Sequence, residues 1–480
     1  MKRRLALILA ALMCLSACGK ETVPENSTTS QNENNAVTET EPADVQDETD
    51  APAETEEAYS DHLLDLTEEE LMKKLGMSIT EGGLSGSKDA ISTRFAEYKE
   101  LGITCVRIDT SWDTSTEGVW KMSGTTKNYL EAAREHGLLL KLILPTIMAP
   151  PSWISSKAGA RLVDYNGRKS VNTVSYWYEG VNEYCACAVD AQMKAIVDGG
   201  WQDVVGAVII DMGPAGEPLY PPAWTQVSDG LSGNDNGAEV MWCYGDNAQA
   251  DFRAKMAEAY STIEAANEAW GTSYASFDEI EVPKPEEIKG KMWEDTLLWY
   301  RDTKRAFMSA QVDTFKKAAE KYGLSTRPLI IYLPGAEFNA HQWKGCVKNG
   351  TAINQVKIFC DNEYAVTLAA EKGCVLQYTG ITGTDGLALT REFMYENGYG
   401  SIPVFGENAG DPGAAGNPKF LADIIVDYSL FGIDYTHSHY LYEEDGTPSR
   451  IHKSLVSQLP VIAEHLENLD LTEVPPAIRK

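Results

Sequence analysis

The sequence is poor in cysteine, with nine in 480 residues, seven of them beyond residue 61. This number is small and odd, so the cysteines do not define a disulfide framework. Cys185 and Cys187 also lack the spacing of a zinc or redox pair. We expect most of the seven to be small buried residues, and a disulfide stays open if the compartment is oxidising. The chain has no repeat of fixed short period.

Positive charge is scarce as well. The chain has 41 Lys and Arg against 71 Asp and Glu, a net charge of −30. Residues 62–480 alone carry about −21. This excess argues against nucleic acid or an anionic lipid surface as a partner and fits a neutral ligand such as a glycan. We expect a monomer.

An N-terminal apolar run, Leu5–Leu15, follows three basic residues and is too short to span a bilayer, which is typical of an export signal. The Leu-Ser-Ala-Cys stretch ending at Cys18 resembles the lipobox of bacterial lipoproteins. We therefore assign 1–19 to a lipoprotein signal peptide and expect Cys18 to be lipidated. A lipid there would anchor the exported protein to the outer face of the cell membrane. The alternative is an ordinary cleaved signal with a chance cysteine.

Residues 20–61 lack aromatic side chains before Tyr59 and carry 13 acidic residues against one lysine. Such a segment cannot bury enough apolar surface to offset its conformational entropy. We predict an acidic disordered tether that its own charge repulsion extends. The remaining residues, 62–480, suffice for one large barrel with insertions.

Alternating strand and helix patterns fill that domain. Short apolar runs predict eight strands at Met77–Ile79, Cys105–Ile108, Leu138–Leu144, Val205–Ile210, Leu329–Leu333, Val375–Tyr378, Ile402–Phe405 and Ile433–Tyr435. Helical periodicity predicts helices near 89–101, 128–135, 183–199, 247–269 and 293–322. This alternation favours an α/β fold, a (β/α)8 TIM-type barrel with long loops at its catalytic end.

Two of these strands are followed by a Gly-Glu pair. Gly216-Glu217 comes after a Gly-Pro break beyond Val205–Ile210, and Gly406-Glu407 comes directly after Ile402–Phe405. The carboxyl ends of barrel strands carry the chemistry of this fold. Two carboxyl groups on either side of a glycosidic oxygen are what sugar hydrolysis requires. Either glutamate alone would more often be a solvated loop residue.

Several stretches resemble β-amylases of glycoside hydrolase family 14. GPAGEPLYPPAW, which contains Glu217, is similar to the family's GPAGELRYPS, and FGENAG, which contains Glu407, is similar to its GENA stretch. VRIDTSWD, APPSWI, WCYGDNAQADFRAKM, LLWYRDTKRAF and LQYTG resemble further family stretches, in the same order along the chain. The resemblance implies a barrel that hydrolyses α-1,4-glucan (starch-type polysaccharide) with inversion of configuration, without metal or cofactor.

The resemblance also implies roles for single residues. Glu217 would be the general acid, with its pKa raised by apolar neighbours, and Glu407 the general base. An inverting pair should lie roughly 6.5–9.5 Å apart. Asp109 would bind hydroxyls of the reacting sugar, although it is also a plausible turn carboxylate. Thr379 would assist the base or hold the bond to be cleaved. Asn408, beside Glu407, is a candidate hydrogen-bond partner for sugar or carboxylate.

Aromatic residues accompany these positions. Side chains that could stack on sugar faces are Trp112, Trp153, Trp177, Tyr220 and Trp224. Each alone is more often a packing residue, but their shared placement on catalytic-end loops favours a carbohydrate cleft.

The chain also departs from the family. After the third strand it has LPTIMAPPSW in place of the family's HQCGGNVGD lid. Tyr332 replaces a family lysine, and Glu337 replaces a nearby histidine and could be a third acidic site residue. His437 and His439 could bind sugar, but without a third ligand they do not predict a metal.

These departures leave two alternatives to starch hydrolysis open. One is a barrel glycosidase for another glycan, β-linked or host-derived, including a retaining enzyme. The large clan of retaining barrel glycosidases usually has Asn directly before its general acid, whereas this chain has Gly216 at that position. The other is a lipoprotein that only binds sugar, although the chain shows neither a duplicated half nor a hinge.

Overall fold

The computed structural model describes residues 66–81, 87–222, 239–335, 337–381, 383–408, 420–435, 441–443 and 447–479. The predictions for the signal peptide, Cys18, the tether, Trp224, His437 and His439 lie outside these residues. The backbone of Asn408 is described, but its side chain is not.

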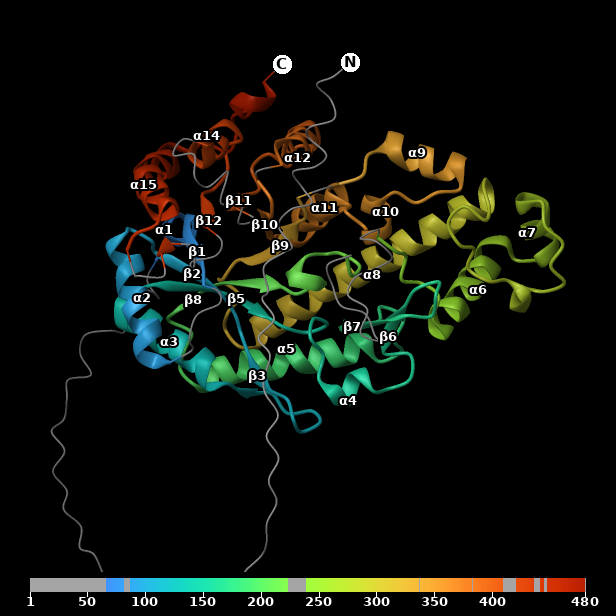
Figure 1. Ribbon diagram of the computed structural model, residues 1–480, viewed down its shortest axis with the longest axis horizontal. Helices are drawn as coiled ribbons and strands as arrows, with labels where there is room; N and C mark the ends of the chain where they lie inside the picture. Colours follow the sequence, from blue (N-terminus) through green and yellow to red (C-terminus); the bar gives the residue numbers. More distant parts are fainter. Residues whose placement is uncertain are drawn as a thin grey trace, which may run out of the picture. The chain divides into compact units, whose positions relative to one another are not determined.

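Eight parallel strands close into a barrel in the order β1-β12-β11-β10-β9-β8-β5-β2 (Figure 1). Their bounds are β1 Met77–Thr80, β2 Cys105–Asp109, β5 Leu139–Leu144, β8 Val205–Ile210, β9 Leu329–Leu333, β10 Val375–Tyr378, β11 Val404–Asn408 and β12 Ile433–Tyr435. The strands are almost wholly buried because helices cover the barrel from outside. The predicted (β/α)8 fold is therefore confirmed.

Helices alternate with the strands. Those that follow or precede barrel strands are α2 Lys88–Glu100, α3 Gly124–His136, α5 Val181–Asp198, α8 Lys291–Lys321, α11 Asn362–Lys372, α12 Thr384–Glu396, α14 Phe420–Asp427 and α15 Arg450–Asn468. Additional elements are α4 Ser152–Ser155, α6 Asp246–Tyr260, α7 Ile263–Trp270, α9 Ala340–Asn349, α10 Asn354–Ile358, the 3-10 turns η2 Pro214–Gly216, η4 Phe277–Glu279 and η6 Pro476–Ile478, and two strand pairs, β3 Trp112–Asp113 with β4 Lys121–Met122 and β6 Arg161–Val163 with β7 Lys169–Val174. Figure 1 shows α6 and α7 on the opposite side of the domain from α14 and α15.

One further helix, α1 (Glu68–Gly76), closes the amino-terminal end of the barrel. Its buried Leu71, Met72 and Leu75 form one apolar cluster with residues near the beginnings of the strands, such as Leu139 and Ile330. Thr67 caps this helix through a reciprocal pair of hydrogen bonds with Glu70. The lower barrel interior is thus apolar, and polar side chains are left for the opposite end.

The structure corrects two local predictions. Strand β11 begins and ends later than predicted, so Glu407 lies within the strand instead of after it. The predicted helix at 247–269 is two helices, because Ser261 has a positive φ of 62° and Thr262 caps α7. The chain between β5 and α5, for which no elements were predicted, contains α4 and the β6–β7 pair.

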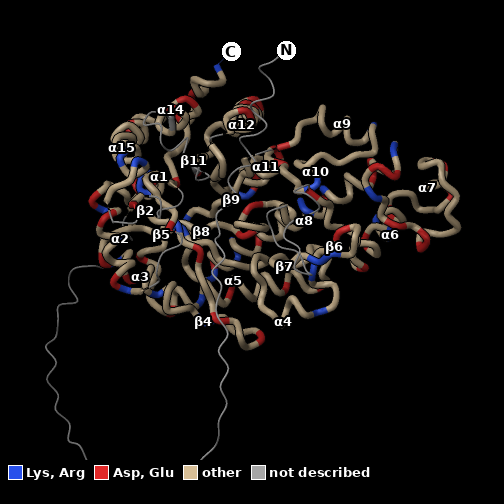
Figure 2. Tube along the Cα trace, viewed as in Figure 1, with Lys and Arg blue, Asp and Glu red and all other residues tan. Residues whose placement is uncertain are grey.

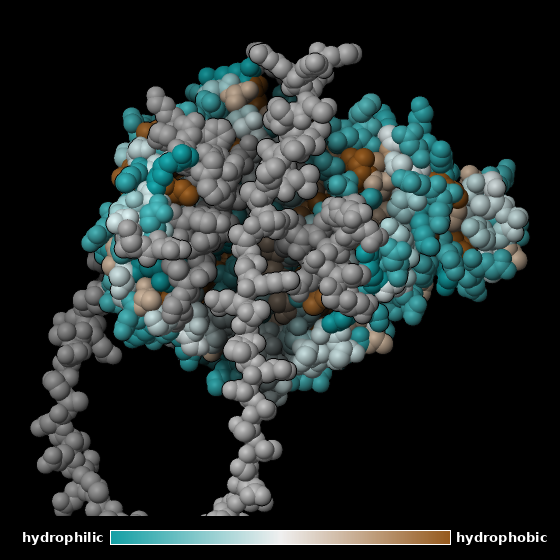
Figure 3. Space-filling model, in the orientation of Figure 1, coloured by the Kyte–Doolittle hydropathy of each residue, from teal (hydrophilic) through white to brown (hydrophobic). Residues whose placement is uncertain are grey.

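The surface of the domain is polar. Figure 2 shows acidic and basic residues interspersed along the outer helices, and on the face in Figure 3 apolar residues form only small patches. None of the helices in the described ranges combines the length and apolar character needed to cross a membrane. All seven cysteines beyond residue 61 are free, and only Cys187 is exposed.

Candidate active site

The loop that carries Glu217 is fixed from its first residue. Asp211, fully buried directly after β8, accepts hydrogen bonds from the backbone N–H groups of Thr146, Met148 and Gly213. The chain then makes the η2 turn, with left-handed φ values of 58° at Ala215 and 82° at Gly216. This tight turn directs the Glu217 side chain toward the neighbouring strand ends.

Glu217 meets Thr379, which directly follows β10. The Thr379 hydroxyl donates a hydrogen bond to Oε1 of Glu217. Burial raises the pKa of Glu217 to about 7; the Thr379 hydroxyl and Arg107 oppose the rise, and the charge of Glu407 adds to it. Glu217 is consequently protonated below neutral pH, as a general acid must be.

Glu407 lies within β11, in register with Asp434 on β12. The Gln377 amide donates a 2.8 Å hydrogen bond to its Oε2, and Nη1 of Arg107 lies 3.6 Å from its Oε1. Burial raises the pKa of Glu407; Arg107 opposes this most strongly, while Asp434 raises the pKa further. A carboxylate beside a guanidinium and an amide donor is suited to accept a proton from water.

The two glutamates therefore face one site at the carboxyl end of the barrel. Thr379, the partner of Glu217, follows β10, and β10 pairs with β11, which carries Glu407. The backbone N–H of Ile381 donates to the Glu407 carbonyl oxygen, joining the two strand ends. Their charges interact, and Arg107 acts on both.

Four charged or amide side chains in the barrel interior were missed by the sequence reasoning: Arg107, Lys141, Gln377 and Asp434. All are buried. Lys141 Nζ lies 3.7 Å from Asp434 Oδ2, and Thr80 and Gln377 also donate to Asp434. The signal available in the sequence was a cation in the middle of an apolar strand, as in CVRID and LLKLIL, because such a residue is rarely buried without a partner.

Asp109 and Thr379 lie at the site in different settings. Asp109 ends β2 with an exposed side chain and pairs with Arg107 Nη2 at 3.2 Å. Thr379 donates a hydrogen bond to Glu217, the candidate acid, and its role in assisting the base or holding the bond to be cleaved stays a prediction.

Tyr332 and Glu337 come from β9 and the loop after it. The Tyr332 side chain is only 1% exposed, its ring lies against Gly216, and the Arg107 guanidinium is 5.7 Å from the ring centre. Glu337 is partly buried, and burial, followed by the charges of Glu363 and Asp361, raises its pKa to about 8. Glu337 is thus mostly protonated at neutral pH, and burial raises the pKa of Tyr332 further above its ordinary value of 10.

The aromatic residues divide into packing groups. Tyr220 is 0% exposed and stacks on Tyr300 with ring centres 4.0 Å apart, so the prediction that it stacks on sugar is wrong. Trp177 is also buried and packs on Tyr220. Trp153 packs edge-on against Trp120 and donates to the Thr114 carbonyl. Trp112 is partly buried and donates to Thr110.

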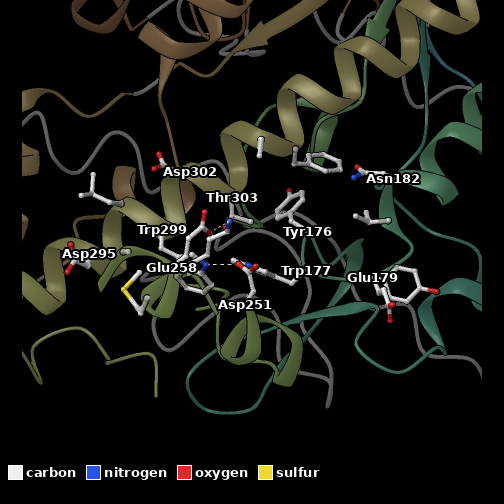
Figure 4. Close-up of a pocket in the computed structure, with 18 residues that line it drawn as sticks. Tyr176, Trp177, Glu179, Asn182, Asp251, Glu258, Asp295, Trp299, Asp302 and Thr303 are labelled. Atoms are coloured by element: carbon white, nitrogen blue, oxygen red, sulfur yellow. Dashed lines mark hydrogen bonds and ion pairs between the residues drawn. The ribbon is translucent and has the colours of Figure 1, made fainter. Parts of the chain in front are cut away.

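A cavity of about 840 Å³ lies elsewhere, between the start of α5, α6 and α8 (Figure 4). The residues that line it include Tyr176, Trp177, Trp299, Asp251 and Asp302. Neither Glu217 nor Glu407 lines it, so this cavity is not the catalytic cleft. Within the described ranges, no group of His, Cys, Asp or Glu side chains is arranged to hold a metal ion.

Comparison with known proteins relates the chain to two kinds of glycosidase. Over 170 residues it is 28% identical to a thermophilic β-amylase of Thermoanaerobacterium thermosulfurigenes, covering 32% of this chain and 28% of that protein. The chain thus matches less than a third of the length of this curated relative. A family model described as β-galactosidase, of glycoside hydrolase family 42, matches residues 232–346.

Solved structures show the same fold. The catalytic domain of a β-amylase from Paenibacillus polymyxa superimposes with a TM-score of 0.66 at 17% identity, covering 82% of this chain and 98% of that one. A β-galactosidase from Marinomonas ef1 has a TM-score of 0.55 at 18% identity, covering 83% and 61%. The barrel and the sequence matches together support a glycoside hydrolase of the (β/α)8 class.

Proposed function

We propose that the protein hydrolyses α-1,4-glucan with Glu217 as general acid and Glu407 as general base. The observation that carries this proposal is the contrast between the two carboxyl groups. Burial raises the pKa of both, and that of Glu217 reaches about 7 beside the Thr379 hydroxyl. At Glu407 the Arg107 guanidinium and the Gln377 amide oppose the rise and favour the carboxylate. Two carboxyl groups in such different settings are suited to opposite roles in proton transfer.

In the proposed reaction Glu217 gives its proton to the glycosidic oxygen as the bond to the anomeric carbon breaks. Glu407 takes a proton from a water molecule, whose oxygen attacks that carbon from the opposite face. The sugar is released with inverted configuration, and a proton exchange with solvent resets both carboxyl groups. Asp109, with its exposed carboxylate, would bind sugar hydroxyls at the mouth.

A second candidate is a retaining glycosidase for another glycan. It is favoured by the family-42 match over residues 232–346 and by the chain after β5, where α4 and the β6–β7 pair stand in place of the β-amylase lid. In this alternative Glu407 would attack the anomeric carbon itself, and Glu217 would act first as acid and then as base.

The product released from soluble starch distinguishes the two. Under the first proposal, proton NMR during the first minutes should show β-maltose before mutarotation produces the α-anomer. The control is the same digest after full mutarotation. No turnover of starch, together with cleavage of an aryl β-galactoside, would replace the first proposal with the second.

The N-terminal sequence also carries a proposal of location. The lipobox-like stretch ending at Cys18 suggests an exported, lipid-anchored enzyme. Changing Cys18 to Ser should then move the protein from the membrane fraction to the soluble fraction of cells that express it. Equal membrane association of both forms would contradict a lipid at this residue.

A further inference from the structure

Lys304, in the middle of α8, is a buried cation attached to the loop of the candidate acid. Its side chain is 0% exposed. Its Nζ donates to the Tyr176 hydroxyl at 2.7 Å, to the Met212 carbonyl at 2.6 Å and to the Leu219 carbonyl at 3.0 Å. An ammonium group has three N–H donors, and here each has an acceptor.

Two of these acceptors belong to residues that flank Glu217 in the sequence. Met212 precedes the η2 turn, and Leu219 follows Glu217 by two residues, so one ammonium joins both ends of the loop. The loop is already tight, since a Cβ at Gly213 would collide with the carbonyl oxygens of Glu217 and Leu219. The Tyr176 hydroxyl, at a wall of the cavity in Figure 4, donates to the Leu219 carbonyl at 2.8 Å.

Lys304 occupies an unfavourable place for a cation. Burial lowers its pKa, and only Asp211 opposes this through its charge. Among the described residues no carboxylate forms an ion pair with it. Burying a charge without an ionic partner destabilises the folded state, and an apolar side chain would fill the same space without this loss of free energy. Filling this space does not require a lysine. Two of its three hydrogen bonds go to the Glu217 loop, so its contribution is to hold that loop.

We infer that Lys304 is a positioning residue for Glu217, holding the loop so that the carboxyl group stays beside Thr379 and in reach of the glycosidic oxygen. This inference rests on the proposed function, because it requires Glu217 to be the acid. Lys304 acts through Glu217 and touches no reacting atom.

The test compares substrates that differ in their need for an acid. Lys304→Met is assayed on methyl and dinitrophenyl α-maltoside. If starch is not turned over, kcat/KM on the matching β-galactosides is compared instead, because kcat of a retaining enzyme also contains the second step, in which Glu217 would act as base. A misplaced acid should lower kcat on the methyl glycoside by about 10²-fold. The dinitrophenyl leaving group departs without a proton, so kcat on that substrate should change only a few-fold, with KM little altered on both.

Glu217→Gln on the same substrates separates this inference from the proposed function. Suppose that the rate loss in Glu217→Gln depends on the leaving group, whereas Lys304→Met lowers the rate on the methyl and the dinitrophenyl glycoside equally. Lys304 then has only a structural role, and the inference is wrong. If Glu217→Gln shows no dependence on the leaving group, the assignment of the acid itself fails.

Two further variants serve as a control and as a fallback. Gln311→Met changes another fully buried polar residue two turns along α8 and should leave the ratio of the two rates unchanged. Should Lys304→Met fail to fold, Tyr176→Phe removes one hydroxyl from the same network and should lower the methyl-to-dinitrophenyl rate ratio several-fold. An unchanged ratio in a folded Tyr176→Phe enzyme would contradict the inference.

Discussion

Glu217→Gln is expected to lose about 10²–10⁴-fold in kcat on a glycoside with a poor leaving group, because the proton donor is gone. On a dinitrophenyl glycoside the same variant should keep most of its activity. Glu407→Gln should be inactive on both substrates, since either leaving group still needs an activated water. Circular dichroism should show that both variants remain folded, because each substitution keeps the shape of the side chain.

The pH profile tests the same assignment. The pKa of Glu217 is raised to about 7, so the acid holds its proton below that pH and loses it above. For the wild-type enzyme, kcat/KM on the methyl glycoside should therefore fall as pH rises through about 7. In Glu217→Gln this alkaline decline should be absent from the rate on the dinitrophenyl glycoside. An unchanged decline in that variant would assign it to another group.

Lys141→Met is expected to destabilise the fold by about 3–5 kcal/mol, because it leaves the carboxylate of Asp434 buried without its cation. Lys141 and Asp434 are both 0% exposed and lie 3.7 Å apart. Asp434→Asn should cost less, because the Lys141 ammonium keeps the Phe405 ring at 4.3 Å and the charge of Glu407. The midpoint and slope of urea unfolding measure both effects.

The double variant Lys141→Met/Asp434→Asn is the matched control. It removes both charges, so its stability should exceed that of either single variant. Equal stability of wild type and Lys141→Met would show that Thr80 and Gln377, which donate to Asp434, suffice to hold the carboxylate.

The sequence predicted the barrel because buried parallel strands are nearly continuous apolar runs, and such runs are local features. Val205–Ile210 and Leu329–Leu333 were placed with their observed bounds for this reason. Strand β11 was placed too early, since Gly406 and Glu407 look like the start of a loop. Their pairing with β12 extends the strand, and pairing between distant segments is not visible in a local pattern.

The candidate site was predicted in part. Motifs drew attention to Glu217, Glu407 and Thr379, which the structure brings to one end of the barrel. Tyr220 was misjudged, because its burial depends on α8, which supplies Tyr300 from 80 residues away. Arg107 stands in the stretch VRIDTSWD, but no role was predicted for it, because its partner Glu407 comes 300 residues later in the chain. Lys304 lay within the family-like stretch LLWYRDTKRAF, but its partners Met212 and Leu219 come more than 80 residues earlier in the chain.

The helix α1 has a consequence for how the enzyme can be handled. It seals the end of the barrel where the strands begin, while Glu217 and Glu407 open at the other end. A bulky group joined directly at Leu66, which packs against the cluster around α1, would therefore lie on the side that a long substrate does not approach.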